Sequence, residues 1–187
     1  MLQISSGTLK GRKIKVMKSN QTRPVTSRFK ELFFNVVSDT FIGNNILDLY
    51  AGTGVIGLEA ISRGANKCIF VEKSKYAVQL LYENTKRMGL NDKVKIFRKD
   101  VSIFLKKNIS DLEFEIIFAD PPYQNFNYLK LLGELRTSSL VLSPSGKLIL
   151  KVHKKQLEII NQEFKFRSYG SGDVNLLLIE SGELNEK

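Results

Sequence analysis

The stretch that decides the fold reads Asn45-Ile46-Leu47-Asp48-Leu49-Tyr50-Ala51-Gly52-Thr53-Gly54-Val55-Ile56-Gly57-Leu58-Glu59. It begins with a short apolar run typical of a strand, turns at two glycines, and continues with apolar residues at helical spacing. In doubly wound sheets, a strand, a tight glycine turn and a helix line a backbone pocket for an adenosine-containing ligand. An ordinary strand-to-helix turn that happens to be rich in glycine also fits this stretch.

Strand and helix patterns alternate along the chain from residue 45 onward. Strands are expected at about 45–50, 67–72, 93–97, 115–119, 147–152, 163–169 and 174–180, and helices at about 54–63, 75–88, 101–107, 127–137 and 154–161. Gly89 is expected to end the second of these helices, and Ser143-Pro144-Ser145-Gly146 to turn into the fifth strand. This alternation predicts an α/β, Rossmann-like fold with a mostly parallel seven-stranded sheet, helices on both faces and an antiparallel edge.

The region before residue 45 is expected to form a β-hairpin and one helix. The hairpin would span residues 2–17, with strands from Ile4 to Leu9 and from Arg12 to Val16 around a turn at Lys10-Gly11. The helix, capped by Thr26 or Ser27, would pack a stripe of apolar residues into the core: Phe29, Leu32, Phe33, Val36 and Val37. We therefore divide the chain into a hairpin extension at 1–22, a Rossmann-like domain at 23–181 and a frayed tail at 182–187.

The composition of the 187 residues is that of a soluble globular domain, with 42% hydrophobic and 26% charged residues. No apolar run approaches the length of a membrane span, and the first residues show no secretory signal. The single cysteine, Cys68, excludes an internal disulfide and a cysteine-based zinc cluster, and its strand-like surroundings favour a buried thiol. We expect a cytoplasmic protein without a metal site.

The net charge of +10 is concentrated at the N-terminus. Residues 1–30 carry no Asp or Glu and eight basic residues: Lys10, Arg12, Lys13, Lys15, Lys18, Arg23, Arg28 and Lys30. A solvated tail would explain such a run, but the alternation Lys13-Ile14-Lys15-Val16 favours a folded strand with one buried face. A folded basic element suits contact with nucleic-acid phosphates. The RNA-binding candidates are Lys10, Arg12, Lys13, Arg23 and Arg28.

Four acidic residues fall at the carboxyl ends of consecutive expected strands: Asp48, Glu72, Asp100 and Asp120. Ligands of open α/β sheets bind at that edge. Glu72 lies about 20 residues beyond the glycine turn, where a carboxylate accepts hydrogen bonds from ribose hydroxyls. Asp100, with the Val101 backbone beside it, could accept from an adenine amino group. Each carboxylate taken alone could instead be a helix cap.

The tetrapeptide Asp120-Pro121-Pro122-Tyr123 follows an expected buried strand. Two prolines stiffen the turn, so the Asp120 carboxylate and the Pro121 carbonyl can converge as two acceptors on one exocyclic amine. An amine held in this way directs its lone pair at an electrophilic methyl group, and Tyr123 offers a ring on which a flipped base can stack. A Pro-Pro loop that merely closes the strand is the alternative.

These motifs together resemble the S-adenosylmethionine-dependent amino-methyltransferases. Two longer strings, Leu47 to Ala65 and Arg23-Pro24-x-Thr26-x-Arg28-x-Lys30-Glu31-x-x-Phe34-Asn35, are similar to the bacterial RsmD family, the 16S ribosomal RNA guanine-N2 methyltransferases. The opening Gly7-x-x-Lys10-Gly11-Arg12-Lys13 also fits that family's N-terminal hairpin. The resemblance covers about residues 3–180. Tyr50 and Tyr123 stand where members often carry phenylalanine, and Ser27 where aspartate is frequent.

The resemblance implies a class I methyltransferase fold and methyl transfer from S-adenosylmethionine to the N2 amine of one guanine. The partner would be 16S rRNA in an assembling small ribosomal subunit, and the enzyme a monomer. Cofactor binding is assigned to Asp48, Ala51, Gly52, Gly54, Glu72, Asp100 and Val101, and catalysis to Asp120, Pro121, Pro122 and Tyr123. This assignment requires Glu72 and Asp120 to face the same side of the sheet.

Two other functions remain open at the level of sequence. Asp-Pro-Pro-Tyr is also the tetrapeptide of adenine-N6 methyltransferases, so an adenine in DNA or RNA is an alternative target. Gly52-x-Gly54-x-x-Gly57 with Glu72 also fits a dinucleotide fingerprint, which would suit a dehydrogenase-type protein or an RNA-binding module without catalysis. His153, the only histidine, matches no motif and is expected at a strand end.

Overall fold

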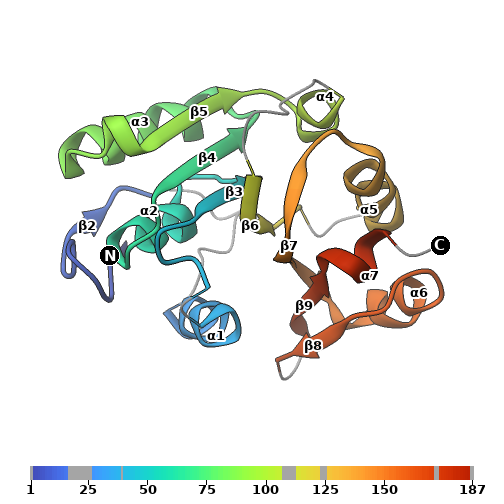
Figure 1. Cartoon of the computed structure of the whole chain (residues 1–187). Helices are drawn as coiled ribbons and strands as arrows, with labels where there is room; N and C mark the ends of the chain where they lie inside the picture. The colour runs from blue at the N-terminus through green and yellow to red at the C-terminus, as the bar shows by residue number, and fades with distance from the viewer. Residues whose placement is uncertain are drawn as a thin grey trace.

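The structure, a computed structural model, describes residues 2–16, 27–38, 40–106, 113–122, 126–170 and 173–185. One seven-stranded sheet runs through the molecule between two layers of helices, and a small two-stranded sheet lies beside it (Figure 1). The residues expected at the site are described except Arg23 and Tyr123, which lie outside these ranges.

The large sheet has the order β5-β4-β3-β6-β7-β9-β8. Its strands are β3 (Asn45–Leu49), β4 (Lys67–Glu72), β5 (Val94–Arg98), β6 (Glu113–Ala119), β7 (Val141–His153), β8 (Arg167–Tyr169) and β9 (Val174–Glu180). Strands β3 to β7 pair in parallel, whereas β9 runs antiparallel to both β7 and β8. The predicted mixed, mostly parallel sheet is confirmed. The strand order reverses between β3 and β6, where doubly wound sheets bind their ligands.

Each face of the sheet is covered by its own group of helices. The first core lies under α1 (Ser27–Val37), α2 (Val55–Ser62), α3 (Lys75–Met88) and the N-terminal hairpin. The second lies under α4 (Val101–Leu105), α5 (Tyr128–Thr137), α6 (Leu157–Asn161) and α7 (Ser181–Asn185). Short 3₁₀ turns, η1 (Asn91–Lys93) and η2 (Lys154–Gln156), precede β5 and α6. The result is the three-layer α/β/α arrangement expected from the alternation of elements.

Helix α1 packs its phenylalanines into the first core, as predicted. Phe33 is fully buried and meets Phe118 of β6 edge to face, with ring centroids 4.9 Å apart. Phe34, which was not part of the predicted stripe, is buried as well, while Phe29 packs at the margin with its centroid 6.3 Å from that of Phe118. Such ring pairs stabilise a core beyond the area they bury, so these phenylalanines attach α1 to the sheet.

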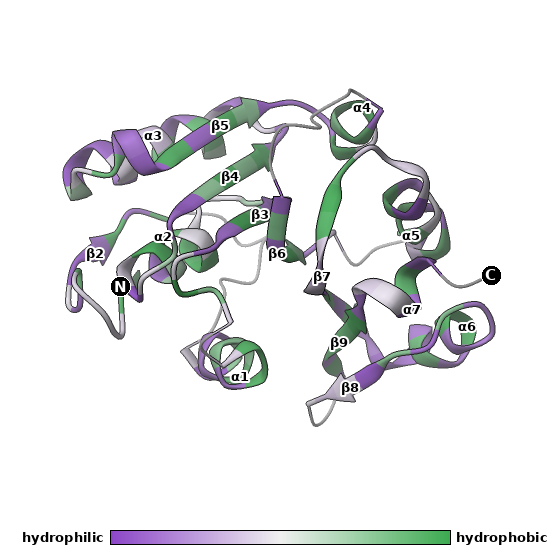
Figure 2. Ribbon diagram, in the orientation of Figure 1, coloured by the Kyte–Doolittle hydropathy of each residue, from purple (hydrophilic) through white to green (hydrophobic). Residues whose placement is uncertain are grey.

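Helix α3 ends where its sequence predicts. The Ser74 hydroxyl accepts a hydrogen bond from the Ala77 amide at the N-terminus, and Gly89 takes the left-handed conformation at φ 69° beyond the last turn. Purple and green alternate along this helix in Figure 2, because one side faces the core and the other faces solvent.

Gly57 allows α2 to lie close against the sheet. A Cβ built on Gly57 would be 2.4 Å from a ring carbon of Phe70 and 2.5 Å from the sulfur of Cys68, both on β4. Gly54, which precedes the helix, has φ 79°, and its Cβ would lie 2.3 Å from a methyl carbon of Leu81. These two glycines therefore serve helix packing and backbone conformation.

The N-terminal hairpin is shorter than predicted. Strand β1 (Leu2–Gln3) pairs antiparallel with β2 (Lys13–Ile14), and only two residues on each side take part. The expected strands from Ile4 to Leu9 and from Arg12 to Val16 are therefore wrong in their bounds. The predicted alternation survives locally, since Ile14 is buried while its neighbour Lys13 is exposed.

Contacts with α2 replace the missing cross-strand pairs. The Thr8 amide donates to the Ser62 carbonyl at 2.7 Å, and the Leu9 amide donates to the Ser62 hydroxyl at 2.9 Å. Gly7, at φ 81°, lies so close that a Cβ would be 1.8 Å from the Ser62 carbonyl oxygen. Backbone groups that the hairpin leaves unpaired are thus satisfied by the helix end.

Strand β7 begins six residues earlier than expected, because Ser143 to Gly146 form an irregularity inside it and not a turn before it. The register to β6 shifts between Phe114 and Ile116, so the extra residues of β7 bulge from the ladder. The Ser143 and Ser145 hydroxyls donate to the carboxylate of Glu115 at 2.6 and 3.0 Å. These two hydrogen bonds fasten the bulge to the neighbouring strand.

The C-terminal segment does not fray from residue 182 as predicted. Ser181 to Asn185 form helix α7, in which Leu184 is only 5% exposed and belongs to the second core. One apolar side chain in a polar stretch is a weak sequence signal, and burial against the sheet decides the outcome.

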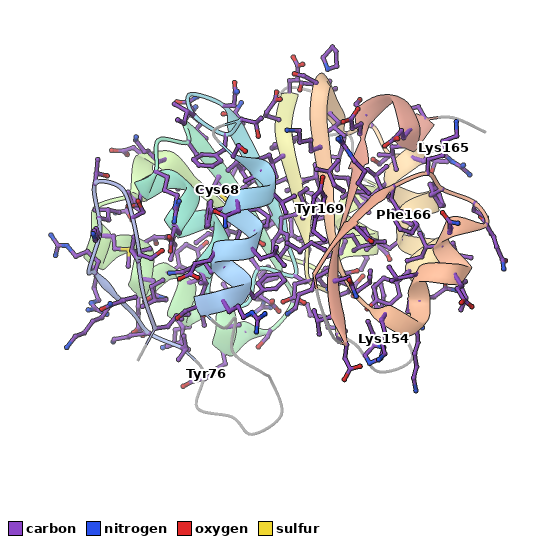
Figure 3. The ribbon with its side chains drawn as sticks, turned by 90° about the horizontal axis from the view of Figure 1, so that it is seen from below. Cys68, Tyr76, Lys154, Lys165, Phe166 and Tyr169 are labelled. Carbon is purple, nitrogen blue, oxygen red and sulfur yellow. The ribbon has the colours of Figure 1, made fainter. Side chains whose placement is uncertain are left out.

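The described residues contain no helix long and apolar enough to cross a membrane. Among the same residues, no group of three or more His, Cys, Asp or Glu side chains could hold a metal ion. Cys68 is fully buried, as predicted, and burial raises the pKa of its thiol well above the usual value. In Figure 3 it lies in the interior, whereas Tyr76 projects from the periphery.

Candidate active site

The sheet register aligns the carboxyl ends of β3, β4 and β6. Asp48 stands opposite Phe70 of β4 and opposite Phe118 of β6. Glu72 and Asp120 each lie two residues beyond those phenylalanines, and residues two apart on a strand face the same side. That side is the one covered by α1, α2 and α3. Glu72 and Asp120 therefore share one side of the sheet.

Asp48 is the buried centre of this edge, only 2% exposed. Burial raises the pKa of Asp48 to about 8. A hydrogen bond from the Gly57 amide opposes this rise, and the negative charges of Asp120 and Glu72 add to it. The Gly57 amide lies 3.3 Å from Oδ2 of Asp48. The negative charges of Glu72 and Asp120 thus act on Asp48 from the two neighbouring strand ends, and such an arrangement is typical of sites that bind or transform a ligand.

Glu72 shapes the glycine turn. Its Oε2 accepts a hydrogen bond from the Gly52 amide and its Oε1 accepts one from the Ser74 amide, both at 2.8 Å. The turn is closed by the Gly54 amide, which donates to the Ala51 carbonyl at 2.8 Å. Each carboxylate oxygen has a second lone pair, so Glu72 can also accept from hydroxyl groups of a ligand.

Gly52 leaves open space where a side chain would stand. It has φ 55°, and a Cβ built on it meets no atom within 4 Å. The backbone there is approachable, next to a carboxylate with remaining acceptor capacity, and this fits a nucleoside that hydrogen-bonds through its ribose. Ala51, beside it, donates its amide to the Val71 carbonyl at 3.0 Å, which anchors the turn to β4.

Asp100 caps the N-terminus of α4, which was the alternative to a cofactor-binding role in the sequence analysis. Its Oδ1 accepts from the Ser102 amide at 3.0 Å at the start of α4, and its Oδ2 lies 3.9 Å from Nζ of Lys73. The side chain is still 45% exposed at the same edge of the sheet. Val101, by contrast, is buried in the second core. Its backbone, and not its side chain, could meet a ligand.

Asp120 follows the last residue of β6 and pairs with a lysine that sequence reasoning missed. Nζ of Lys151 on β7 donates to Oδ2 of Asp120 at 2.7 Å, and the lysine side chain is 9% exposed. Pro121 is buried and Pro122 is exposed. Lys151 interrupts the apolar run from Leu148 to Val152, and this interruption was the signal that could have revealed it.

Aromatic side chains stand beside this corner. Phe126 meets both Tyr50 and Tyr128 edge to face, with ring centroids 5.7 and 5.0 Å apart. Tyr50, directly after β3, adopts φ 59°, a left-handed conformation that is strained for a residue with a side chain. The buried hydroxyl of Tyr128 has no hydrogen-bond partner within the described ranges, and burial together with the charge of Asp120 raises the pKa of Tyr128 to about 12.

Four of the five basic candidates are described, and all four are exposed. Lys10, Arg12 and Lys13 are exposed on the hairpin, and Arg28 is exposed at the start of α1. Contacts that the sequence did not reveal hold the hairpin in place. One of them is the fully buried Asn84 of α3, whose Nδ2 donates to the Lys15 carbonyl at 2.9 Å and to the Thr53 carbonyl at 3.2 Å. Asn84 thereby joins the end of the hairpin to the glycine turn.

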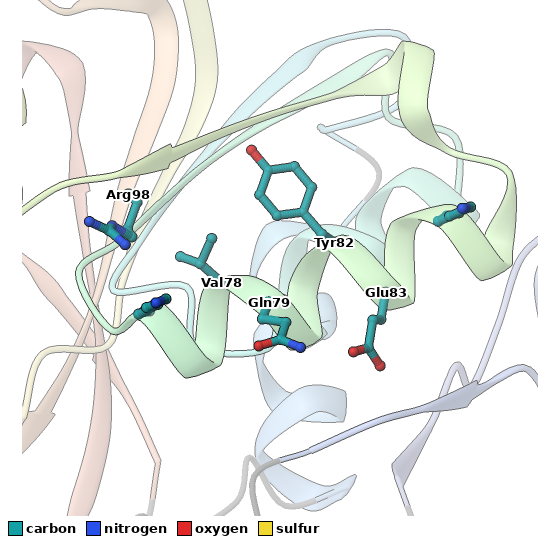
Figure 4. Close-up of a pocket in the computed structure, with 7 residues that line it drawn as sticks. Val78, Gln79, Tyr82, Glu83 and Arg98 are labelled. Carbon is teal, nitrogen blue, oxygen red and sulfur yellow. The ribbon is translucent and has the colours of Figure 1, made fainter.

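A separate shallow groove of about 590 Å³ lies along α3 and the edge strand β5 (Figure 4). Lys75, Val78, Gln79, Tyr82, Glu83, Lys86 and Arg98 line it. It faces away from Asp48 and Asp120, since Gln79 and Tyr82 are on the solvent side of α3. His153 lies outside both places, at the end of β7, where its Nδ1 accepts from the Lys155 amide at 3.2 Å.

Comparison with known proteins identifies relatives over most of the chain. A family model described as "conserved hypothetical protein 95" matches residues 2–179. YlbH of Bacillus subtilis is 35% identical over 84% of this chain and 85% of its own length. Ribosomal RNA small subunit methyltransferase D of Buchnera aphidicola (from Acyrthosiphon pisum) is 33% identical over 85% of this chain and 82% of its own.

Solved structures of other proteins have the same fold. The Escherichia coli protein yhhF superposes with a TM-score of 0.81 over 96% of this chain and 97% of its own, at 23% identity. The protein SMU.776, solved in complex with SAH, reaches a TM-score of 0.62 over 78% of this chain and 48% of its own, at 18% identity. At these identities the likeness concerns the fold, which is that of class I methyltransferases. By sequence, the chain belongs to the conserved hypothetical protein 95 family, which is also the family of RsmD and YlbH.

Proposed function

We propose that this protein is an S-adenosylmethionine-dependent methyltransferase that modifies the exocyclic N2 amine of one guanine in 16S ribosomal RNA. The observation that carries the proposal is the position of Asp48 between Glu72 and Asp120, both of which act on its charge. In this proposal a cofactor edge and an amine-holding corner would adjoin at the point where the strand order reverses. The name of the Buchnera relative supports ribosomal RNA of the small subunit as the substrate.

The cofactor would lie along the glycine turn. Glu72 would accept hydrogen bonds from its ribose hydroxyls, and Gly52 would admit it close to the backbone. Asp100 and the Val101 backbone would meet the adenine, and Asp48, with Ala51 and Gly54, would complete the pocket. S-adenosylmethionine supplies an electrophilic methyl group bound to a positively charged sulfur. The Glu72 carboxylate beside the glycine turn suits that cation.

Asp120 and the Pro121 carbonyl would hold the two hydrogens of the guanine amine, and Tyr123 would stack on the base. Held in this way, the amine nitrogen would accept the methyl group that the cofactor supplies, and the surplus proton would pass to water. Positioning and electrostatic stabilisation account for this chemistry, so it needs no strong base. Pro122 would keep the turn rigid, while Lys10, Arg12, Lys13, Arg23 and Arg28 would bind RNA phosphates.

The decisive experiment incubates the protein with labelled S-adenosylmethionine and small subunits from cells that lack the modification, and then maps the label. Label on the N2 atom of one guanine is the expected result. Label on adenine N6 would refute the guanine assignment, and absence of transfer to any RNA would refute the function. Asp120→Ala should nearly abolish transfer and leave cofactor affinity close to wild type, whereas exposed Asp92→Asn should change neither.

A further inference from the structure

Lys151 is a cation placed inside the sheet next to the carboxylate that the proposed function relies on. Asp120 follows Phe118 and Ala119 on β6, and these two residues pair with Ile149 and Leu150 of β7. The register therefore brings Lys151 level with Asp120, and Nζ reaches Oδ2 at 2.7 Å. Their side chains are 9% and 20% exposed, so water screens this pair only weakly.

The environment of Lys151 fixes its head group. Its neighbours in the strand, Leu150 and Val152, are buried and apolar. The Lys151 ammonium lies 4.6 Å from the ring centroid of Phe29 on α1. A cation over an aromatic face is attracted by the ring, more strongly where water is excluded. Phe29 also packs on Phe118, so α1 closes over the pair from the same side as the expected cofactor.

The charges around Asp120 explain why a cation is needed there. Asp48 on β3 and Glu72 on β4 are acidic residues. The charge of Asp120 also raises the pKa of the Tyr128 hydroxyl on α5. A nearby negative charge favours protonation of a carboxyl group, as the charge of Asp120 does for Asp48. A protonated Asp120 would turn one of its oxygens from an acceptor into a donor, which cannot hold the hydrogen of an amine.

We propose that Lys151 is a positioning residue for methyl transfer: it orients the Asp120 carboxylate and keeps it ionised, so that Asp120 can accept from the substrate amine. This inference rests on the proposed function, in which Asp120 holds the amine. Lys151 itself need not touch the substrate. A buried ion pair with a purely structural role would affect stability alone, and this difference makes the inference testable.

The test compares three variants by their pH dependence. Lys151→Met removes the charge at similar length, Lys151→Arg retains it, and Lys147→Met makes the same change elsewhere on β7, opposite Glu180. The quantity compared is the pH profile of kcat/KM with small subunits as the substrate. In Lys151→Met, the acidic limb of this profile should move to higher pH by about one to three units, which is the range for loss of a neighbouring opposite charge. Lys151→Arg should restore the limb, and Lys147→Met should not shift it.

A readout independent of catalysis separates this inference from the proposed function. Carboxyl ¹³C NMR, with the Asp120 signal assigned by its loss in Asp120→Asn, should show that the carboxyl titrates at higher pH in Lys151→Met than in wild type. An unshifted titration and an unshifted pH profile in folded Lys151→Met would overturn the inference. If that variant does not fold, wild-type behaviour of Lys151→Gln would overturn it equally. Inactive wild-type protein with a shifted titration would refute the function and leave the electrostatic role standing.

Discussion

Lys30 of α1 and Glu59 of α2 form an ion pair in the interior, with Nζ 2.5 Å from Oε2 and side chains 3% and 0% exposed. The Ser5 hydroxyl and the Arg63 guanidinium also donate to Glu59, so hairpin, α1 and α2 meet at one carboxylate. Burial alone would raise the pKa of Glu59, but the hydrogen bonds from Lys30, Ser5 and Arg63 outweigh it and lower that pKa.

Replacement of Glu59 should be among the most destabilising single changes. Glu59→Ala leaves the buried Lys30 ammonium without its carboxylate partner, which costs about 3–5 kcal/mol of unfolding free energy. Urea denaturation measures the loss. The matched control is Glu83→Ala, which removes the exposed pair with Lys15 and should cost less than about 1 kcal/mol. Because the pKa of Glu59 is lowered, its contribution should fade as the pH drops below about 4.5.

Asp48 should make the protein less stable as the pH rises. Its pKa is raised from 3.8 to about 8, so between these values the folded protein keeps a proton that the unfolded chain releases. The unfolding free energy then falls by up to about 1.4 kcal/mol per pH unit. Asp48→Asn has no carboxyl proton to lose, so its unfolding free energy lacks this pH dependence. The wild type should therefore lose stability relative to the variant between pH 5.5 and 8. Parallel stability curves would contradict the prediction.

Gly57 should not tolerate a methyl group. Gly57→Ala would place Cβ 2.4 Å from Phe70, and the shift of α2 away from β4 should cost about 1–3 kcal/mol, measured by thermal or urea unfolding. Gly133→Ala is the matched control in α5, where an added Cβ meets nothing within 4 Å. It should stabilise the protein by about 0.5–1 kcal/mol through helix propensity. Equal effects of the two changes would argue against close packing at Gly57.

Glu72→Gln should weaken cofactor binding. The amide keeps the size of the side chain but turns one of two acceptors into a donor, which then faces the amide of Gly52 or Ser74. Loss of a charged hydrogen bond is worth about 1.5–3 kcal/mol, or at least a tenfold rise in Kd for S-adenosylmethionine by calorimetry. Asp92→Asn serves as the control. Unchanged affinity in Glu72→Gln would move the ribose site elsewhere.

The hairpin should account for part of the salt dependence of RNA binding. The double variant Lys10→Ala/Lys13→Ala removes two exposed cations, and each lost phosphate contact reduces the slope of log K against log salt by about 0.7–0.9. Lys154→Ala/Lys165→Ala removes the same charge at the opposite side of the molecule (Figure 3) and should leave the slope unchanged. Filter binding at several salt concentrations compares the two. Equal slopes in both double variants would exclude the hairpin as the phosphate contact.

Local sequence signals predicted much of the site because they act over a few residues. Strand, glycine turn and helix around Gly52 follow from hydrophobic period and backbone freedom, and Gly89 marks the end of α3. The positions of Asp48, Glu72 and Asp120 at strand ends follow from the same patterns. The bounds of the hairpin and of β7 do not follow from local patterns, because contacts of Ser62 and Glu115 with distant residues set them.

The amino-acid sequence alone determined the α/β alternation, the glycine turn and the order in which acidic residues end the strands. Only the tertiary structure decided that Lys151 pairs with Asp120, that Lys30 is buried against Glu59, and that Asn84 joins Lys15 to Thr53. In each of these pairs the partners are about 30 to 70 residues apart in the chain. A charged or amide side chain favours the surface by its own chemistry, and burial becomes favourable only when folding supplies the complementary group.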